Sequence, residues 1–455
     1  MEKVDLIVNN AIILTMDAQE QLIEQGAMAI KDGQIMALGS VEDLQDKYAA
    51  VQTHDAGGKL LLPGFINTHA HLFQTFSRGL GKDMPFVEWL ANSVRLIMPY
   101  MDEEAYYLAA MIGCMEAMQT GITTMLDYMY ANVKPEFAIA VIRAFEDVGI
   151  RGIMGRGLCD REILPWGSRS TTYEPMDVCL GEIHRLQIKY QNHPRIKIAM
   201  APTAIWGMTR EGLAATAEFS RENDLLVTMH LQENSMDDDY ALKEYGIRSL
   251  PLMEEVGMLN ARFNIVHGIV LEAEDYQLLE QYKVSLSHNP HSNMILGSGV
   301  APVPELLKRG IKIGLGVDGA ASNDDQNMLS LMKSAALLQK VHHLDAGVMG
   351  AREVLSMATR QGAESIGFED SIGSLEVGKK ADFVLVDQMA PNMVPCYDHS
   401  TSLVYNSHPG NIDSVVINGK FVIEKGNFTS IDVEEIICHA NQKASELRKL
   451  AEIVS

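Results

Sequence analysis

The sequence lacks the features that define several large classes of protein. Its five cysteines contain no CxxC pair and are odd in number, so we expect no disulfide framework. No cluster of Lys and Arg occurs and the net charge is −23, which argues against nucleic acids and anionic membranes as partners. The N-terminus has no basic segment followed by an apolar one, and no run of about 18 apolar residues is present. These absences predict a cytoplasmic protein that binds neither nucleic acid nor membrane.

The cysteine pattern also excludes the small zinc enzymes that carry an H-x-E…P-C-x-x-C signature. Low-complexity segments and short-period repeats are absent as well. What the chain does have is length, because 455 residues of which 47% are hydrophobic can bury a large core.

Both ends of the chain carry short apolar segments separated by turn residues. These segments are 5–8, 11–15 and 27–30 at one end and 381–387 and 414–423 at the other. The last of them turns at Asn418-Gly419, which is a strong hairpin signal. The shared style predicts one small β-sandwich domain built from residues 1–60 and 370–430, although the sequence leaves open two unrelated β patches. The final segment, 431–455, predicts a C-terminal helix.

Residues 61–369 alternate between apolar runs and helical stretches. The apolar runs include 121–127, 196–202, 225–230, 263–267, 284–288 and 311–318, and the helical stretches include 208–223 and 273–282. Such alternation is typical of α/β proteins with a parallel sheet. The number of units and the length predict a (β/α)8 TIM barrel over this range.

Polar residues end several of these runs. His69 and His71 follow an apolar run, and because side chains alternate along a strand, both can point the same way and hold one metal ion. Other runs end at His230, His267 and Asp318. The C-terminal strand ends of a barrel share the face that holds the active site, so these residues would converge. Three His and one Asp are a ligand set for Zn²⁺ or a similar ion, whereas a single histidine would more often be a hydrogen-bonded core residue.

A carboxyl follows one of these histidines closely. Glu233 lies three residues after His230, where it could sit beside the metal and carry a proton; a solvated loop carboxylate is the alternative. The acidic run that follows, Asp237-Asp238-Asp239, is expected to be such a solvated loop.

Seven motifs together carry a family resemblance over nearly the whole chain. They are PGFINTHAH (63–71), MHLQE (229–233), VHG (266–268), SHNPHSN (287–293), GVAPVPELLKRG (299–310), GLGVDGAASND (314–324) and GSLEVGKKADFVLVD (373–387). The chain resembles the amidohydrolase superfamily, and more narrowly its aminohydrolase/chlorohydrolase group. That group holds methylthioadenosine/S-adenosylhomocysteine deaminases, guanine and 8-oxoguanine deaminases, pterin deaminases and triazine hydrolases.

The resemblance implies a role for each strand-end residue. His69, His71, His230 and Asp318 would ligate one divalent metal ion, Zn²⁺ or alternatively Fe²⁺. Asp318 would also accept the proton of the water that the metal activates, and His267 would contact that water. Glu233 would protonate the ring nitrogen beside the reacting carbon, after which ammonia leaves.

Four further residues are expected to bind substrate: Gln74, Trp89, Arg156 and Thr203. The adenosine branch of the group places a ribose-binding Glu shortly after a Trp like Trp89, but this chain has Met98 there, and Thr203 stands in place of a His. Gln74 is similar to guanine-type and triazine enzymes, and its amide can pair with both a donor and an acceptor on a ring. Arg156 matches an Arg of the adenosine branch, with a surface salt bridge as the alternative.

The sequence therefore predicts a metal-dependent hydrolytic deaminase of a small heterocyclic amine, such as an oxopurine, a pterin or a triazine, acting as a homodimer. Three alternatives stay open. They are an adenosine-type deaminase acting on methylthioadenosine or S-adenosylhomocysteine, a triazine chlorohydrolase, and an inactive barrel acting as a binding protein.

Overall fold

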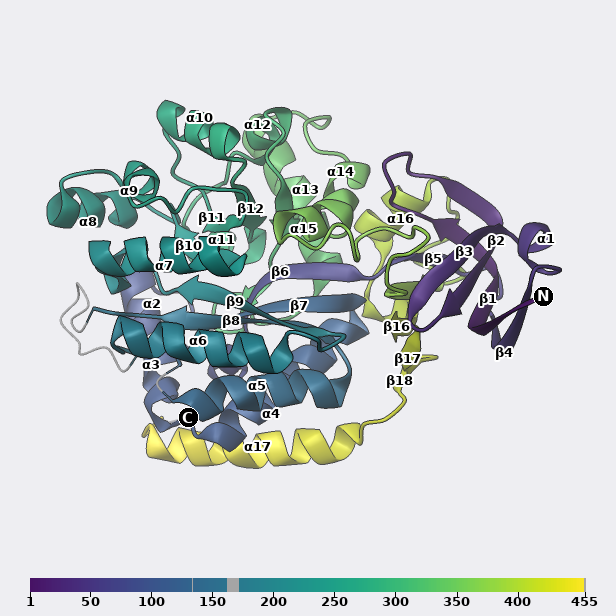
Figure 1. The fold of residues 1–455 in the computed structure, drawn as a ribbon, viewed down its shortest axis with the longest axis horizontal. Coiled ribbons are helices and arrows are strands. Elements are labelled where there is room, and N and C mark those ends of the chain that lie inside the picture. Colours follow the sequence, from purple (N-terminus) through teal and green to yellow (C-terminus); the bar gives the residue numbers. More distant parts are fainter. Residues whose placement is uncertain (133, 162–171, 454–455) are drawn as a thin grey trace.

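The structure, a computed structural model, describes residues 1–132, 134–161 and 172–453, and its centre is a closed barrel of parallel strands (Figure 1). Each strand pairs with the next along the chain, and the last pairs with the first, with Leu315 opposite Asn67. The strands are β6 (Phe65–His71), β7 (Ile122–Met129), β8 (Arg151–Leu158), β9 (Ile196–Pro202), β10 (Val227–Leu231), β11 (Phe263–His267), β12 (Ser285–His288) and β13 (Ile313–Leu315), with β14 (Asp318–Gly319) extending the last one along β6. The predicted (β/α)8 barrel is confirmed.

Helices surround these strands and cover the outside of the barrel (Figure 1). In α5, for example, Phe137, Val141, Phe145 and Val148 recur at helical spacing and are all buried. The elements are η1 (Leu72–Ser77), α2 (Phe86–Asn92), α3 (Val94–Ile97), η2 (Met98–Tyr100), α4 (Glu103–Gln119), α5 (Pro135–Val148), α6 (Met176–Tyr190), η3 (Ile205–Gly207), α7 (Arg210–Asn223), α8 (Met236–Tyr245), α9 (Ser249–Glu255), α10 (Ala273–Tyr282), α11 (Pro290–Ile295), α12 (Val303–Lys308), α13 (Met328–His343), α14 (Ala351–Met357) and α15 (Arg360–Ser365).

The two ends of the chain form one nine-stranded sheet beside the barrel (Figure 1). Its strands are β1 (Glu2–Leu14), β2 (Leu22–Lys31), β3 (Gln34–Ser40), β4 (Tyr48–Asp55), β5 (Leu60–Pro63), β15 (Phe383–Val386), β16 (Ile412–Ile417), β17 (Lys420–Glu424) and β18 (Asn427–Phe428). The ends meet where β15 runs antiparallel to β5, with Leu385 opposite Leu61. A strand-rich unit of both termini is thus confirmed, and the alternative of two unrelated β patches is wrong.

The remaining helices are α1 (Val41–Leu44), α16 (His399–Asn406), η4 (Pro409–Asn411) and α17 (Val433–Leu450). The C-terminal helix α17 lies along α4 at the lower edge of the barrel in Figure 1. It buries Ala440 and Leu447, and Lys443 Nζ lies 3.0 Å from Asp102 Oδ2 at the start of α4. None of the described helices is long and apolar enough to cross a membrane.

Candidate active site

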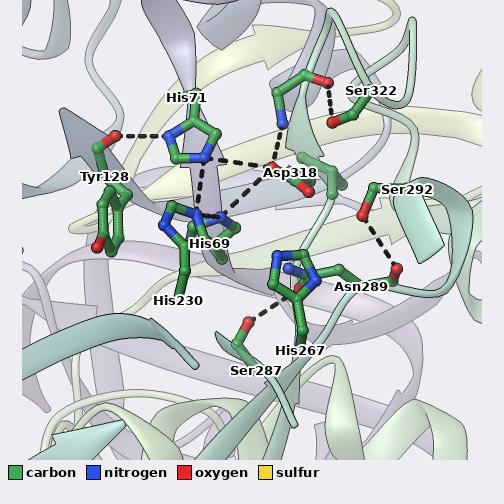
Figure 2. Close-up of polar contacts among 12 residues, drawn as sticks. His69, His71, Tyr128, His230, His267, Ser287, Asn289, Ser292, Asp318 and Ser322 are labelled. Atoms are coloured by element: carbon green, nitrogen blue, oxygen red, sulfur yellow. Dashed lines mark hydrogen bonds and ion pairs between the residues drawn. The ribbon is translucent and has the colours of Figure 1, made fainter. Parts of the chain in front are cut away.

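Side chains from four strand ends meet at the C-terminal face of the barrel (Figure 2). His69 and His71 end β6, His230 lies in β10, His267 ends β11 and Asp318 begins β14. His267 and Asp318 have φ angles of 79° and 64°, a backbone region that non-glycine residues rarely adopt and that costs about 1–3 kcal/mol each. The surrounding barrel must hold these two residues in place, which is a common property of functional sites.

Four nitrogen and oxygen atoms lie at the spacing of zinc ligands. His230 Nε2 is 3.1 Å from His71 Nε2 and 3.3 Å from His69 Nε2. Asp318 Oδ1 is 3.4 Å from His69 Nε2 and 3.3 Å from His71 Nε2. Tetrahedral Zn²⁺ with bonds of about 2.0–2.1 Å separates its ligand atoms by about 3.3 Å. The four side chains therefore fit one tetrahedral metal ion, and the three histidines are grouped closely enough to hold it.

Backbone carbonyls orient two of the histidines. His71 Nδ1 lies 2.6 Å from the Tyr128 carbonyl oxygen, and His230 Nδ1 lies 3.0 Å from that of Thr203. Since a carbonyl oxygen only accepts, each Nδ1 carries the hydrogen and each Nε2 keeps its lone pair for a metal. Burial lowers the pKa of His69 to about 4 and that of His71 and His230 to about 3, so all three are neutral at physiological pH, as metal ligands must be.

Asp318 is the anionic member of the group. Its burial alone would raise the pKa of the carboxyl, but its interactions with the neighbouring histidines, above all the hydrogen bond from His69, outweigh that effect and hold the pKa well below its usual value. The carboxylate therefore stays ionised beside the histidines.

A second carboxyl lies close to the metal-site histidines and behaves in the opposite way. Glu233 is buried, with Oε2 3.8 Å from His267 Nε2, and Ser298 Oγ donates a hydrogen bond of 3.1 Å to Oε1. Burial raises the pKa of Glu233, an effect that His267 and Ser298 only partly offset. A carboxyl with a raised pKa can hold a proton and then give it up near neutral pH, which is the property of a general acid.

These residues open into a cavity of about 280 Å³. His71, His230, His267, Glu233 and Asp318 all line it. Much of the remaining wall is apolar and aromatic, which is typical of a small-molecule site. These apolar residues include Phe86, Trp89, Leu90, Val94, Met98, Trp206 and Leu296.

Three of the four expected substrate-binding residues line this cavity. They are Gln74, Trp89 and Thr203. Gln74 Nε2 donates to the Tyr130 hydroxyl at 3.0 Å, and Gln74 Oε1 is buried without a partner among the described residues. Trp89 Nε1 donates to the Ala321 carbonyl, which fixes the indole against the loop after Asp318.

Arg156, the fourth expected substrate-binding residue, is not among the described residues that line the cavity. Its side chain is 0% exposed and forms ion pairs with Glu182 of α6 and, at 2.7 Å, with Glu174. Successive side chains of a strand face opposite sides, and Arg156 faces the helix layer rather than the cavity. Arg156 therefore forms a salt bridge, which was the alternative interpretation of the sequence, but this salt bridge is buried and not at the surface.

The acidic run after Glu233 also differs from expectation, because it is not a solvated loop. Asp237 is buried and lines the cavity, and its Oδ2 accepts the backbone N–H of Glu233 at 3.3 Å. Burial and the neighbouring Glu233 raise the pKa of Asp237 to about 7. Asp238 forms an ion pair with Arg248 at 2.9 Å. The three aspartates lie in the first turn of α8, and this turn points Asp237 toward the cavity.

The sequence did not point to several further polar residues of the cavity wall, among them Tyr130 and Arg95. Tyr130 follows β7 directly, so the strand-end rule that found the histidines could have found it as well. Arg95 lies in the short helix α3, where no sequence pattern marks it as part of a site.

Comparison with known proteins places the chain among close structural relatives. A model of the Amidohydrolase family matches residues 60–422. A 5-methylthioadenosine/S-adenosylhomocysteine deaminase of Syntrophobacter fumaroxidans is 34% identical over 435 residues, which are 96% of each chain. An adenosine deaminase from Xanthomonas campestris with bound zinc is similar in structure, with a TM-score of 0.91, 27% identity and coverage of 98% of this chain and 99% of that one. The atrazine chlorohydrolase of Arthrobacter aurescens, also with zinc, has a TM-score of 0.89 at 25% identity, covering 96% and 100%.

Proposed function

This chain belongs to the amidohydrolase family and is a hydrolase that acts on C–N bonds, and from that premise we propose that it deaminates a small amino-substituted nitrogen heterocycle with one bound Zn²⁺ ion. The observation that carries the proposal is the group of His69, His71, His230 and Asp318 at zinc-ligand spacing, with the protonatable Glu233 in the same cavity. A barrel that only binds a ligand would need neither this group of metal-binding side chains nor a protonatable carboxyl beside it.

The mechanism divides the proton transfers between two carboxyls. A bound Zn²⁺ ion would lower the pKa of water toward neutrality and so supply hydroxide for the attack. The ionised Asp318 accepts the proton that this water gives up, and His267, which lines the cavity, orients the water. Glu233 donates its proton to the ring nitrogen next to the carbon that bears the amine, so negative charge does not build up on the ring. Asp318 then gives the proton that it accepted to the amine, which leaves as ammonia, while Glu233 takes back a proton from the oxygen that attacked, so that both carboxyls return to their starting states.

For the substrate we propose first an adenine nucleoside with a 5′-thioether, such as 5′-methylthioadenosine or S-adenosylhomocysteine. The name of the Syntrophobacter fumaroxidans relative supports this substrate, and the apolar wall around Met98 and Trp206 suits an apolar thioether. This choice replaces the free oxopurine, pterin or triazine preferred from the sequence, because the comparisons support the adenosine-type alternative better.

A free heterocyclic base is the second candidate, and Gln74 is the observation that favours it. Its unpartnered Oε1 can accept from a ring N–H, while Met98 cannot bind the paired hydroxyls of a ribose. A site whose polar groups bind the hydroxyls of a ribose discriminates by about 10⁴-fold or more against a compound that lacks them. The difference in kcat/KM between nucleosides and free bases should therefore separate the two candidates.

Ammonia release from the zinc-loaded protein tests the proposal. The panel contains 5′-methylthioadenosine, S-adenosylhomocysteine, adenosine, guanine, 8-oxoguanine, a pterin and melamine, with chloride release from atrazine measured in parallel. We expect the two thioether nucleosides to give the highest kcat/KM. A free base as the best substrate would reverse the order of the two candidates, chloride release would support the chlorohydrolase alternative, and no turnover of any compound would contradict the deaminase.

A further inference from the structure

One short segment contacts two side chains that the proposed mechanism uses, Glu233 and His267. It consists of helix α11 and the turn that follows it, Gly297-Ser298-Gly299. At the turn, Ser298 Oγ donates to Glu233 Oε1 at 3.1 Å. In the helix, Asn293 Oδ1 lies 2.9 Å from His267 Nδ1. Glu233 follows strand β10 and His267 ends strand β11, and this segment contacts both side chains.

The conformation of the backbone around Ser298 sets the position of its hydroxyl. The Ser298 N–H donates to the Asn293 carbonyl at 2.9 Å, which ties the turn to α11. Gly297 and Gly299 have φ angles of 64° and 127°, which side chains rarely allow, and a Cβ at Gly299 would lie 2.9 Å from Ile269 Cγ2. Glycine on both sides of the serine therefore lets the turn adopt this form without backbone strain, and at Gly299 no larger residue would fit without a shift.

The hydrogen bond from Ser298 gives the two carboxyl oxygens of Glu233 different surroundings. Oε1 is held by Ser298, whereas Oε2 faces His267 Nε2 at 3.8 Å. Ser298 is not among the described residues that line the cavity, while Glu233 and His267 both are. Any effect of the serine on the reaction must therefore pass through the carboxyl that it holds.

We propose that Ser298 is a positioning residue that fixes the Glu233 carboxyl, leaving Oε2 as the oxygen that exchanges the proton with the substrate ring. This role rests on the proposed function, because it requires Glu233 to transfer a proton. In a preorganised site, a group that is already aligned needs no reorganisation when the reaction occurs, so loss of the alignment lowers kcat more than it changes substrate binding.

The first test replaces the hydroxyl and then restores it. We expect Ser298→Ala to lower kcat for ammonia release about 10- to 100-fold while KM changes less than about twofold and metal content stays the same. Ser298→Thr keeps a hydroxyl and should recover most of the lost kcat. Met294→Ala, in the adjoining helix α11 and 45% exposed, is the matched control and should behave as the wild type. If Ser298→Ala does not fold, Ser298→Cys, with its weaker donor, takes its place.

The second test measures coupling between the two side chains. In the Glu233→Gln background, Ser298→Ala should lower kcat less than about twofold, because the carboxyl it positions is already gone. A full additional loss in that background, or wild-type kcat in Ser298→Ala alone, would overturn the positioning role. Full activity of Glu233→Gln would instead overturn the proton-transfer role in the proposed function. The two failures therefore give different results in the same set of variants.

Discussion

At the scale of single residues, each metal-site side chain depends on a neighbour for its chemical state. Backbone carbonyls of Tyr128 and Thr203 set the proton position of His71 and His230, and His69 keeps Asp318 ionised. The same burial that keeps the histidines neutral pushes Glu233 toward its protonated form. Burial therefore acts on bases and acids in opposite directions and produces the two kinds of group that the reaction needs.

Loss of a metal ligand should abolish the reaction. We expect His69→Ala and Asp318→Ala each to bind much less zinc and to show no measurable ammonia release, because a three-ligand remnant holds the ion weakly. Elemental analysis of the purified variants together with the ammonia assay checks this. His54→Ala, a histidine of β4 outside the barrel, is the control and should keep both metal and activity. Full activity of the wild type after exhaustive chelation would contradict the metal site altogether.

Substitution of Glu233 should separate proton transfer from metal binding. Glu233→Gln keeps the shape of the side chain but cannot donate the same proton, so we expect kcat to fall about 10²–10⁴-fold with a normal zinc content. The measurements are steady-state kinetics and metal analysis on the same sample. A variant that has lost its zinc would show that Glu233 is a ligand rather than an acid.

The buried carboxyl of Asp127 should make stability depend on pH. Burial raises its pKa from 3.8 to about 7, while Oδ1 accepts the Leu72 N–H at 2.8 Å. A raised pKa in the folded state means that the folded protein holds the proton more tightly than the unfolded chain does. The contribution of Asp127 to the free energy of unfolding should therefore fall as pH rises from 3.8 toward about 7, by at most about 1.4 kcal/mol per pH unit, and be constant above that range.

Asp127→Asn removes this titration, so its unfolding free energy should depend less on pH between 4 and 7 than that of the wild type. Chemical denaturation at several pH values measures the difference. Equal pH dependence of the two proteins would show that Asp127 is not perturbed in the fold.

At the scale of elements, strand ends supply the chemistry and helices hold them in place. None of the described residues of the C-terminal helix α17 lines the cavity, and the helix packs along α4 and covers it with one apolar face (Figure 1). Leu447 on that face is 2% exposed, whereas Leu450, one turn further, is 56% exposed. This helix therefore contributes to the stability of the barrel and not to its reaction.

Leu447→Ala should lower the free energy of unfolding by about 2–5 kcal/mol, because a buried leucine leaves a cavity when it is shortened. Leu450→Ala, on the same helix, should change it by less than about 0.5 kcal/mol. Denaturant unfolding compares the two, and zinc content and kcat should be unchanged in both folded variants. Equal effects of the two substitutions would mean that α17 is not docked on α4 in solution.

At the scale of the whole molecule, the barrel and the terminal sheet share a buried ion pair. Arg151, at the start of barrel strand β8, forms two hydrogen bonds of 2.6 and 3.0 Å with Asp382, which precedes sheet strand β15. Asp382 also accepts the backbone N–H of Asn418 in the hairpin of the sheet. The barrel and the sheet are therefore joined by an ion pair to which each of them contributes one charge.

Two properties of the whole molecule stay predictions. They are the homodimer and the cytoplasmic location.

Asp382→Ala should lower the free energy of unfolding by about 3–5 kcal/mol, because it leaves the Arg151 charge buried without a partner. The double variant Arg151→Met, Asp382→Leu removes both charges and should recover much of that loss. Unfolding curves from fluorescence and circular dichroism measure both. A separate early transition in Asp382→Ala, with zinc still bound, would show that the sheet unfolds independently of the barrel.

The sequence by itself determined the class of fold, and it predicted the residues that the structure brings together as proposed metal ligands and the Glu233 carboxyl beside them. Strand periodicity is local, and a strand end is visible wherever an apolar run meets a polar residue, so His69, His71, His230, His267 and Asp318 could all be found from it. Strand β8 was not singled out, because its Arg-Gly-Ile-Met-Gly-Arg-Gly-Leu segment has two arginines and three glycines where an apolar run is expected.

Only the tertiary structure decided which side each remaining side chain faces and what lies opposite to it. Arg156 was expected in the site because it matches an Arg of the adenosine branch, but one step along a strand reverses the direction of a side chain, and Arg156 pairs with Glu182 of helix α6. Asp237 was assigned to solvent by its charge, but the first turn of α8 carries it into the cavity. Arg95 and Ser298 reach the cavity wall and Glu233 through contacts between segments distant in sequence, and such contacts follow from packing, which no local pattern records.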